Sequence, residues 1–370
     1  MKKFTIKPKI IFDNNALTYI RTMNEKRFFI MADPFLIENK MIKRVTDELL
    51  DKEHKIYSHI IPDPPLESVA RGIKEMEEYN PDCLIAVGGG SAIDTAKAVL
   101  FYGKNKKIKF IAIPTTSGTG SEVTAFSVIT DKDKGVKYPL VSEEMLPDVA
   151  ILDTQFVKSV PPKIVADTGM DVLVHAIEAY VSVASNDFSD AFAEKAIRLL
   201  WDNLLKSYSE PDNLEAKDKM HKASLMAGLA FNSASLGLNH AMAHNMGAKL
   251  KIPHGRINAI LLPKIIEFNS GVMSFNSTDI HDCAKKYAQV AKLIGFEGNN
   301  TKILVRKLIL EIEKLIKRLN LPSGLSDCKI ELSYEDMCAI AEGTLNDNCI
   351  NTNPHKVKKE NIIDILKNLG

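Results

Sequence analysis

The sequence lacks several features that mark particular classes of protein. No run of apolar residues is long enough to cross a bilayer, and the first residues, MKKFTIKPKI, lack the apolar core of a signal peptide. Neither sign of charge dominates, because 48 Lys and Arg stand against 47 Asp and Glu. Without excess positive charge there is no general attraction to nucleic acid or to anionic lipid. We therefore expect a cytoplasmic protein that binds neither nucleic acids nor membranes.

Cysteine is sparse and shows no ligand spacing. The chain has five cysteines, an odd number, and no CxxC pair of the kind that binds zinc through thiolates. Scattered cysteines of this kind are typical of reduced thiols in a cytosolic protein. The residues concerned are Cys83, Cys283, Cys328, Cys338 and Cys349.

A chain of 370 residues, 45% of them hydrophobic, can bury a large core, and its length suggests two domains. Up to about residue 160, short apolar runs at 28–32, 83–87 and 108–113 alternate with helical patterns at 37–52 and 66–79. This alternation is typical of successive βαβ units. We expect residues 1–160 to form an α/β domain with a doubly wound parallel sheet.

After Pro161 and Pro162 the apolar residues recur at helical intervals, and no segment has a convincing strand pattern. We therefore expect residues 161–370 to form an all-helical domain. One clear example of the helical spacing is the set Ile303, Leu304, Leu308, Ile312, Leu315, Ile316 and Leu319.

A glycine-rich turn joins the strand expected at 83–87 to a helical stretch at 94–102. The turn reads Gly88, Gly89, Gly90, Ser91. Glycines at such a turn let backbone amides approach a phosphate, and the helix N-terminus supplies partial positive charge. The turn therefore predicts a pyrophosphate cradle. The spacing is not GxGxxG, and a tight connection without a ligand is the alternative.

A second polar loop follows the strand expected at 108–113 and runs from Pro114 to Glu122, rich in Ser, Thr and Gly. In open α/β sheets, ligands bind at the carboxyl ends of the strands, where both loops should meet. A flexible loop without a ligand is the alternative here. Asp33 follows the strand at 28–32, where a carboxylate can bind the adenosine ribose and repel a 2′-phosphate, so that NAD is favoured over NADP. Asp33 is equally suited to capping a helix that begins at Pro34.

Candidate metal ligands lie at helical spacing in the second half. Asp171 and His175 are four residues apart, as are His240 and His244, so that each pair lies on one face of a helix. His254 follows in the turn Pro253-His254-Gly255. One carboxylate with three imidazoles suits a divalent first-row metal. The spacing does not choose between His240 and His244.

Each histidine alone could instead cap a helix or satisfy a core hydrogen bond, and that interpretation is kept for His54, His59, His221, His281 and His355. Five candidate ligands in apolar, alanine-rich surroundings favour a shared ion, because unpaired polar groups are costly to bury. Glu178, one turn beyond His175, and Glu122 are candidates for orienting the ligands, with exposure at the surface as the alternative.

These motifs together resemble the iron-containing (group III) alcohol dehydrogenase family from Lys7 to Pro354. The matching segments, in the family's order, are GGGSAIDTAK, IPTTSGTGSEVT, TGMDVLVHAIEAYVS and GLNHAMAHNMGAKLKIPHG. The resemblance implies a dinucleotide domain followed by a helical domain, and a dehydrogenase that interconverts short-chain primary alcohols and aldehydes, such as propanol and propanal or ethanol and ethanal.

Carried over by position, the resemblance implies particular site residues. The metal ligands would be Asp171, His175, His240 and His254, with His244 near the nicotinamide and the substrate. The residues lining NAD(H) would be Gly89, Gly90, Ser91, Asp94, Thr115, Thr116, Thr119 and Lys137, in addition to Gly88 of the cradle. Iron as Fe²⁺ is implied only by the resemblance, because Zn²⁺ should bind such ligands at least as tightly.

The expected chemistry is Lewis-acid catalysis with hydride transfer, in which His244 shuttles the hydroxyl proton. Residues 131–140 resemble the 1-propanol dehydrogenases that accompany bacterial microcompartments, which implies such an association. We also expect a homo-oligomer, in the first instance a dimer. Three departures from the family pattern, Asn245, Arg256 and His355, bear on substrate preference rather than on the chemistry.

Two other functions compete with this interpretation. A lyase resembling 3-dehydroquinate synthase would also pair NAD with a metal, but its charged substrate would require several Lys and Arg near the ligands. The neighbours of the ligands in the sequence are apolar, for example Val172, Val174 and Met242. A non-catalytic scaffold that only binds nucleotide would have no need of a complete ligand set.

Overall fold

The computed structural model describes residues 4–104, 108–131 and 136–370. The chain divides into two compact units. One spans Thr5–Val160, and the other is built from Pro161–Gly370, on which Phe4 packs through its contacts with Phe188 and Phe192.

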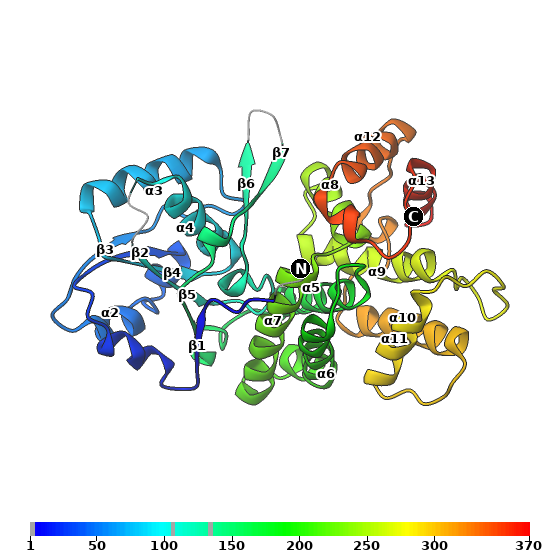
Figure 1. The fold of residues 1–370 in the computed structure, drawn as a ribbon, viewed down its shortest axis with the longest axis horizontal. Coiled ribbons are helices and arrows are strands. Elements are labelled where there is room, and N and C mark those ends of the chain that lie inside the picture. Colours follow the sequence, from blue (N-terminus) through cyan, green and yellow to red (C-terminus); the bar gives the residue numbers. More distant parts are fainter. Residues whose placement is uncertain (1–3, 105–107, 132–135) are drawn as a thin grey trace. The chain divides into compact units, whose positions relative to one another are not determined.

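The first unit is built on a six-stranded parallel sheet with the strand order β1-β8-β5-β4-β2-β3 (Figure 1). The strands predicted at 28–32, 83–87 and 108–113 are β2, β4 and β5, each within one residue of its predicted bounds. The sheet strands are β1 (Lys9–Phe12), β2 (Arg27–Ala32), β3 (Glu53–Tyr57), β4 (Cys83–Gly88), β5 (Lys109–Pro114) and β8 (Val149–Leu152). A separate antiparallel hairpin pairs β6 (Phe126–Asp131) with β7 (Val136–Val141).

Both faces of the sheet are buried, as its apolar strands require. In β2, Phe28 and Ile30 pack on one face with Val45, whereas Phe29 and Met31 pack on the other. Helices α3 (Leu66–Tyr79) and α4 (Gly90–Tyr102) cover the second face through side chains such as Val69, Met76, Ile93 and Val99. The predicted doubly wound α/β fold of this part of the chain is confirmed.

The helix predicted over 37–52 is wrong in its extent. The structure has two short helices there, α1 (Pro34–Glu38) and α2 (Lys43–Leu49). The break lies at Lys40, whose φ of 64° is left-handed, and the Asn39 side chain accepts a hydrogen bond from the Met41 backbone N–H. Asn readily forms such local bonds, which compete with a continuing helix. The predicted helix at 94–102 also begins earlier, at Gly90.

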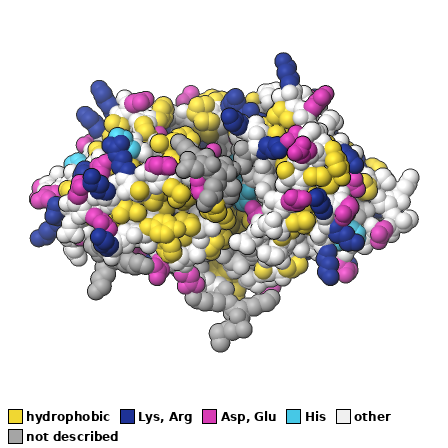
Figure 2. Space-filling view, turned by 90° about the horizontal axis from the view of Figure 1, so that it is seen from above, with side chains coloured by type: hydrophobic (Ala, Val, Ile, Leu, Met, Phe, Trp, Pro, Cys, Tyr) yellow, Lys and Arg dark blue, Asp and Glu magenta, His cyan; other side chains and the backbone are white. Residues whose placement is uncertain are grey.

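The second unit is helical, and its described residues contain no strand. The predicted helical pattern around 303–319 corresponds to α11, and none of the helices described anywhere in the chain is long and apolar enough to span a membrane. Lys and Arg are interspersed with Asp and Glu on the face shown in Figure 2. The helices are α5 (Pro162–Val181), α6 (Asp187–Ser209), α7 (Leu214–Ala234), α8 (Leu238–Leu250), α9 (His254–Ser270), α10 (Ala284–Leu293), α11 (Thr301–Arg318), α12 (Tyr334–Leu345) and α13 (Lys359–Lys367).

Candidate metal centre and cofactor loops

Helix α5 presents three ionisable side chains on one buried face. Asp171, His175 and Glu178 are 5%, 5% and 3% exposed, and they follow one another at intervals of about one helical turn. Ionisable groups are this deeply buried only where partners satisfy them. The hydrogen-bond partners of Asp171 and Glu178 come from α8 and α9.

Glu178 holds the first turn of α8 in place. Its carboxylate accepts hydrogen bonds from the backbone N–H groups of Asn239 (2.7 Å) and His240 (3.3 Å), which have no partner within the helix. The same carboxylate lies 2.6 Å from Nδ1 of the His240 ring. One side chain therefore both caps the helix and fixes the ring of His240, with Nε2 pointing away from Glu178.

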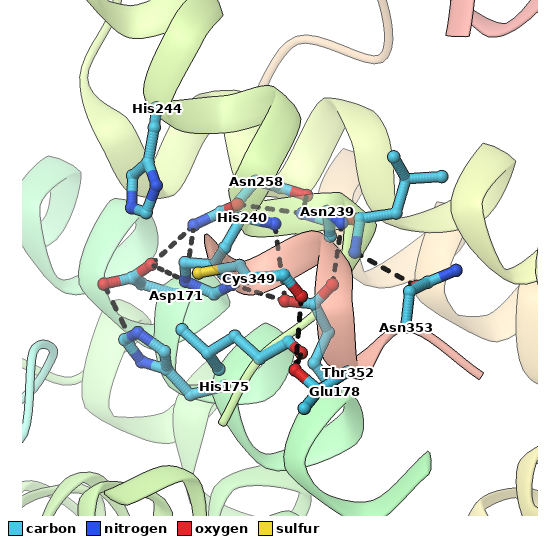
Figure 3. Close-up of polar contacts among 12 residues, drawn as sticks. Asp171, His175, Glu178, Asn239, His240, His244, Asn258, Cys349, Thr352 and Asn353 are labelled. Atoms are coloured by element: carbon cyan, nitrogen blue, oxygen red, sulfur yellow. Dashed lines mark hydrogen bonds and ion pairs between the residues drawn. The ribbon is translucent and has the colours of Figure 1, made fainter. Parts of the chain in front are cut away.

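The predicted ligands converge on Asp171, and Figure 3 shows His175 and His240 beside it. Nε2 of His240 and Nε2 of His254 each lie 3.6 Å from Asp171 Oδ1, and Nδ1 of His175 lies 4.0 Å from Oδ2. Ligand atoms of Asp171, His240 and His254 all lie within 4.8 Å of one another, and the ring of His175 stacks on that of His240 at 4.5 Å. The structure therefore brings together all four side chains that the resemblance implied.

Asn258 is a central member of this cluster that the sequence analysis missed. It lies one turn after His254 on α9, and its Nδ2 donates to Asp171 Oδ1 at 2.7 Å. The same nitrogen lies 3.2 Å from His240 Nε2 and 3.1 Å from His254 Nε2, while its Oδ1 accepts from Asn239 at 2.8 Å. Its position four residues after His254 could have predicted it, because residues at this spacing share one face of a helix. Asn258 orients the carboxylate from which the site is built.

The electrostatics of the cluster suit a cation. Although burial raises the pKa of Asp171, the neighbouring His175 and the other two imidazoles hold it well below its usual range. Burial lowers the pKa of His240, but its hydrogen bonds to Asp171 and Glu178 outweigh this and raise the pKa to about 9. The carboxylates of Asp171 and Glu178 thus favour positive charge on the ring of His240, which lies between them. The ionised carboxylate of Asp171 also attracts a cation to the position that it shares with His240 and His254. Imidazole and carboxylate ligands fit a divalent first-row metal ion.

His244 lies beside the cluster but has a different partner. Its ring is stacked on that of His254 at 5.4 Å, and its Nδ1 lies 2.8 Å from Oδ2 of Asp347. The other oxygen of Asp347 accepts from the backbone N–H of Cys349 at 2.8 Å. Sequence analysis missed Asp347 because 103 residues separate it from His244. Of the two histidines on α8, His240 faces Asp171, whereas His244 faces Asp347.

In the α/β unit the two polar loops lie against each other. The Thr115 backbone N–H donates to Gly88 O at 3.0 Å. A Cβ added to Gly89 would lie 3.3 Å from Thr116 Oγ1, and one added to Gly90 would lie 2.7 Å from Thr119 Cγ2. A side chain at Gly90 would therefore force Thr119 to move, and one at Gly89 would crowd Thr116. Helix α4 begins at this junction, with Ser91 in its first turn.

The two acidic residues predicted for the cofactor, Asp33 and Asp94, form hydrogen bonds within their own unit. Asp33 follows β2, its N–H donates to Val87 O, and its side chain accepts from Phe35 N, so that the capping role of Asp33 is confirmed. The carboxylate of Asp94 accepts from Ser121 Oγ (2.6 Å) and from Val128 N (3.0 Å). The side chain of Lys137 lies outside the described part of the chain.

A buried lysine in this unit was not predicted. Lys97 is fully buried and donates to Ser121 Oγ, Thr124 Oγ1 and Phe126 O. Burial lowers the pKa of Lys97 to about 8, and burial raises the pKa of the neighbouring Glu122 to about 7. Glu122 and Glu178 are 2% and 3% exposed, so neither lies at the surface. Of these two candidates for orienting the ligands, Glu178 contacts the predicted ligand His240, whereas Glu122 is buried in the α/β unit.

Comparison with known proteins gives consistent matches over the whole chain. Residues 7–154 match the family model for iron-containing alcohol dehydrogenases, and residues 165–370 match the C-terminal model of the Fe-containing alcohol dehydrogenase family. The chain is 40% identical to the 1-propanol dehydrogenase PduQ of Salmonella typhimurium, with all of both chains covered. It is 37% identical to an NADPH-dependent butanol dehydrogenase of Clostridium saccharobutylicum, with 99% of this chain and 97% of the relative covered. A solved 1,3-propanediol oxidoreductase superposes with a TM-score of 0.92 at 31% identity, with both chains fully covered.

Proposed function

Because the chain belongs to the iron-containing alcohol dehydrogenase family, we propose that it uses NAD(H) and a divalent metal ion to interconvert short-chain primary alcohols and aldehydes. The two family models confirm the resemblance drawn from the sequence. The observation that carries the proposal is the convergence of His240 and His254 on the buried carboxylate of Asp171. Propanol and propanal, or ethanol and ethanal, are the substrates we propose first.

In this proposal Asp171, His175, His240 and His254 hold the metal ion, which we take to be Fe²⁺, with Zn²⁺ as the alternative. When bound, the ion would supply a Lewis acid that stabilises negative charge on the substrate oxygen. Glu178 fixes the ring of His240, and Asn258 orients Asp171. These two side chains keep the ligands ready for the ion.

The cofactor is proposed to lie on the loops of the α/β unit. Gly88, Gly89, Gly90 and Ser91 offer backbone N–H groups at the start of α4, where the helix dipole favours a phosphate. Asp94, Thr115, Thr116, Thr119 and Lys137 complete the proposed set. Asp33 favours NAD, because a carboxylate beside the ribose repels a 2′-phosphate. The butanol dehydrogenase relative is named as NADPH-dependent, so the cofactor must be measured directly.

His244 is proposed to accept the hydroxyl proton during alcohol oxidation, because an imidazole exchanges protons near neutral pH. The substrate is small and uncharged in this proposal. The matches to alcohol dehydrogenases favour this function over a lyase resembling 3-dehydroquinate synthase.

The test is NADH oxidation with a panel of aldehydes that starts with propanal, on protein purified without oxygen. We expect turnover that is lost on chelation and restored by Fe²⁺ or Zn²⁺, and metal analysis identifies the native ion. His254→Ala should lose both metal and turnover, whereas His54→Ala, at an exposed histidine outside the cluster, should retain both. The absence of turnover with every small aldehyde would contradict the proposal and favour the lyase or a nucleotide-binding scaffold.

We also propose that the enzyme is a cytoplasmic homodimer. Because residues 131–140 resemble the 1-propanol dehydrogenases that accompany bacterial microcompartments, we propose further that it associates with a microcompartment. Light scattering on the purified protein tests the dimer. Co-purification with shell proteins from the native cell tests the association, and a protein recovered only in the soluble, shell-free fraction would contradict it.

A further inference from the structure

The ring of His244 is held by a carboxylate that lies far away in the sequence. Nδ1 of His244 lies 2.8 Å from Oδ2 of Asp347, and the two side chains are 27% and 11% exposed. We propose that Asp347 is a positioning residue, which fixes the orientation and the tautomer of His244 for proton transfer. The inference rests on the proposed function, because it is the dehydrogenase reaction that requires a proton acceptor.

Asp347 is itself held in place on both sides. Its Oδ1 accepts from the backbone N–H of Cys349, at the start of the short 3-10 helix Asn348–Thr352. The hydroxyl of Thr352, at the end of that helix, donates to Leu236 O just before α8. Because each end of the segment is bonded, the carboxylate cannot move away from α8 without breaking these contacts.

The packing of α12 against α8 brings the segment close to His244. Gly343 lies near the end of α12, four residues before Asp347, and a Cβ at this position would lie 2.0 Å from Oδ1 of Asn245. Any larger residue at this position would force the Asn245 side chain to move. Asn245, directly beside His244 in the sequence, therefore faces α12, which ends two residues before Asp347.

This geometry determines which nitrogen of His244 carries the proton. An ionised carboxylate can only accept hydrogen bonds, so Nδ1 must carry the hydrogen and Nε2 keeps its lone pair. Although burial raises the pKa of Asp347, its hydrogen bond with His244 outweighs burial and lowers the pKa, so the carboxylate stays ionised. During alcohol oxidation the hydroxyl O–H bond breaks and its proton forms a new bond to Nε2, while the hydride passes to NAD⁺. Aldehyde reduction is the reverse.

A second cation bound by His244, Asp347 and Cys349 is the competing explanation of this cluster. The contacts favour the hydrogen-bonded pair, because both oxygens of Asp347 and Nδ1 of His244 are already engaged.

The first test is a double-mutant cycle with Asp347→Ala, His244→Ala and the double variant, measured on protein loaded to equal metal content. We expect Asp347→Ala to lower kcat at least tenfold with little change in KM, because orientation of a general base is needed only for the chemical step. In the His244→Ala background the same change should alter kcat less than twofold. Asp336→Asn, which removes a half-exposed carboxylate that pairs with Lys249, is the control and should leave kcat unchanged. Additive losses in the cycle would overturn the proposal.

The second test does not depend on activity and uses Asp347→Asn. If the amide oxygen keeps its bond to Cys349 N–H, the amide NH₂ faces Nδ1 of His244 and forces the proton to Nε2. Nitrogen NMR of histidine-labelled, zinc-loaded protein should therefore show Nδ1–H for His244 in the wild type and Nε2–H in the variant. A wild-type ring protonated at Nε2 would overturn the proposal even if the enzyme is active. Conversely, a wild-type Nδ1–H ring in a protein without alcohol turnover would overturn the proposed function and leave the pairing intact. Asp347→Asn also answers the question if Asp347→Ala does not fold.

Discussion

Replacing Glu178 by Gln should weaken metal binding without removing any predicted ligand. Oε1 of Glu178 accepts from Asn239 N at 2.7 Å, and Oε2 accepts from both the backbone N–H and the ring Nδ1 of His240. If the amide oxygen of Gln keeps the bond to Asn239, its NH₂ faces two donors. The ring of His240 must then change its tautomer or its orientation, and Nε2 loses its place beside Asp171.

Two independent estimates give the size of this loss in metal affinity. A hydrogen bond to a charged group contributes about 1.5–3 kcal/mol. Loss of a partner that orients a ligand typically costs about 10- to 100-fold in metal affinity, equivalent to about 1.4–2.8 kcal/mol. Because the ranges agree, we expect the affinity of Glu178→Gln for Zn²⁺ to fall about 10- to 100-fold.

The assay is competition for Zn²⁺ against a chromophoric chelator of known affinity, with circular dichroism to verify the fold. Glu194→Gln is a matched control, since Glu194 also lies in the helical unit and its carboxylate accepts a hydrogen bond, but from Tyr180 at 3.0 Å and not from a predicted ligand. We expect the control to bind Zn²⁺ like the wild type. A folded Glu178→Gln protein whose affinity stays within twofold of the wild type would refute the reasoning.

Three further predictions concern stability. Gly255→Ala should destabilise the fold by about 1–3 kcal/mol, because its Cβ would lie 2.0 Å from Asp167 O; urea unfolding of the metal-free protein measures this. Arg256→Ala should lower the free energy of unfolding by about 1–3 kcal/mol in the same assay, because the largely buried carboxylate of Asp167 loses its two hydrogen bonds of 3.0 and 2.9 Å. Arg256→Lys should recover only part of this loss, because lysine cannot make both bonds. Burial and the stacked His281 lower the pKa of His355 in the folded protein. The His355 ring therefore binds a proton more readily in the unfolded chain, and the free energy of unfolding should fall as the pH drops below about 6.5. His355→Gln should reduce this fall, and an unchanged pH dependence would count against it.

Much of the fold was predictable because its signals are local. The strands β2, β4 and β5 are short apolar runs that end in polar turn residues, and a strand buried on both faces has no other pattern in sequence. The helix at 37–52 was mispredicted because its apolar spacing continues through Asn39 and Lys40, where the backbone turns left-handed. Apolar spacing records which residues face the core, but not whether the chain between them stays helical.

For the candidate metal centre, the sequence by itself determined which residues share a helix face. Asp171 with His175, and His240 with His244, follow from helical geometry alone. Only the tertiary structure decided that His240 faces Asp171 while His244 faces Asp347, and that Glu178 and Asn258 hold the ligands. The physical reason is that these contacts join different helices, and their geometry depends on how α5, α8, α9 and the segment after α12 pack together rather than on spacing along the chain.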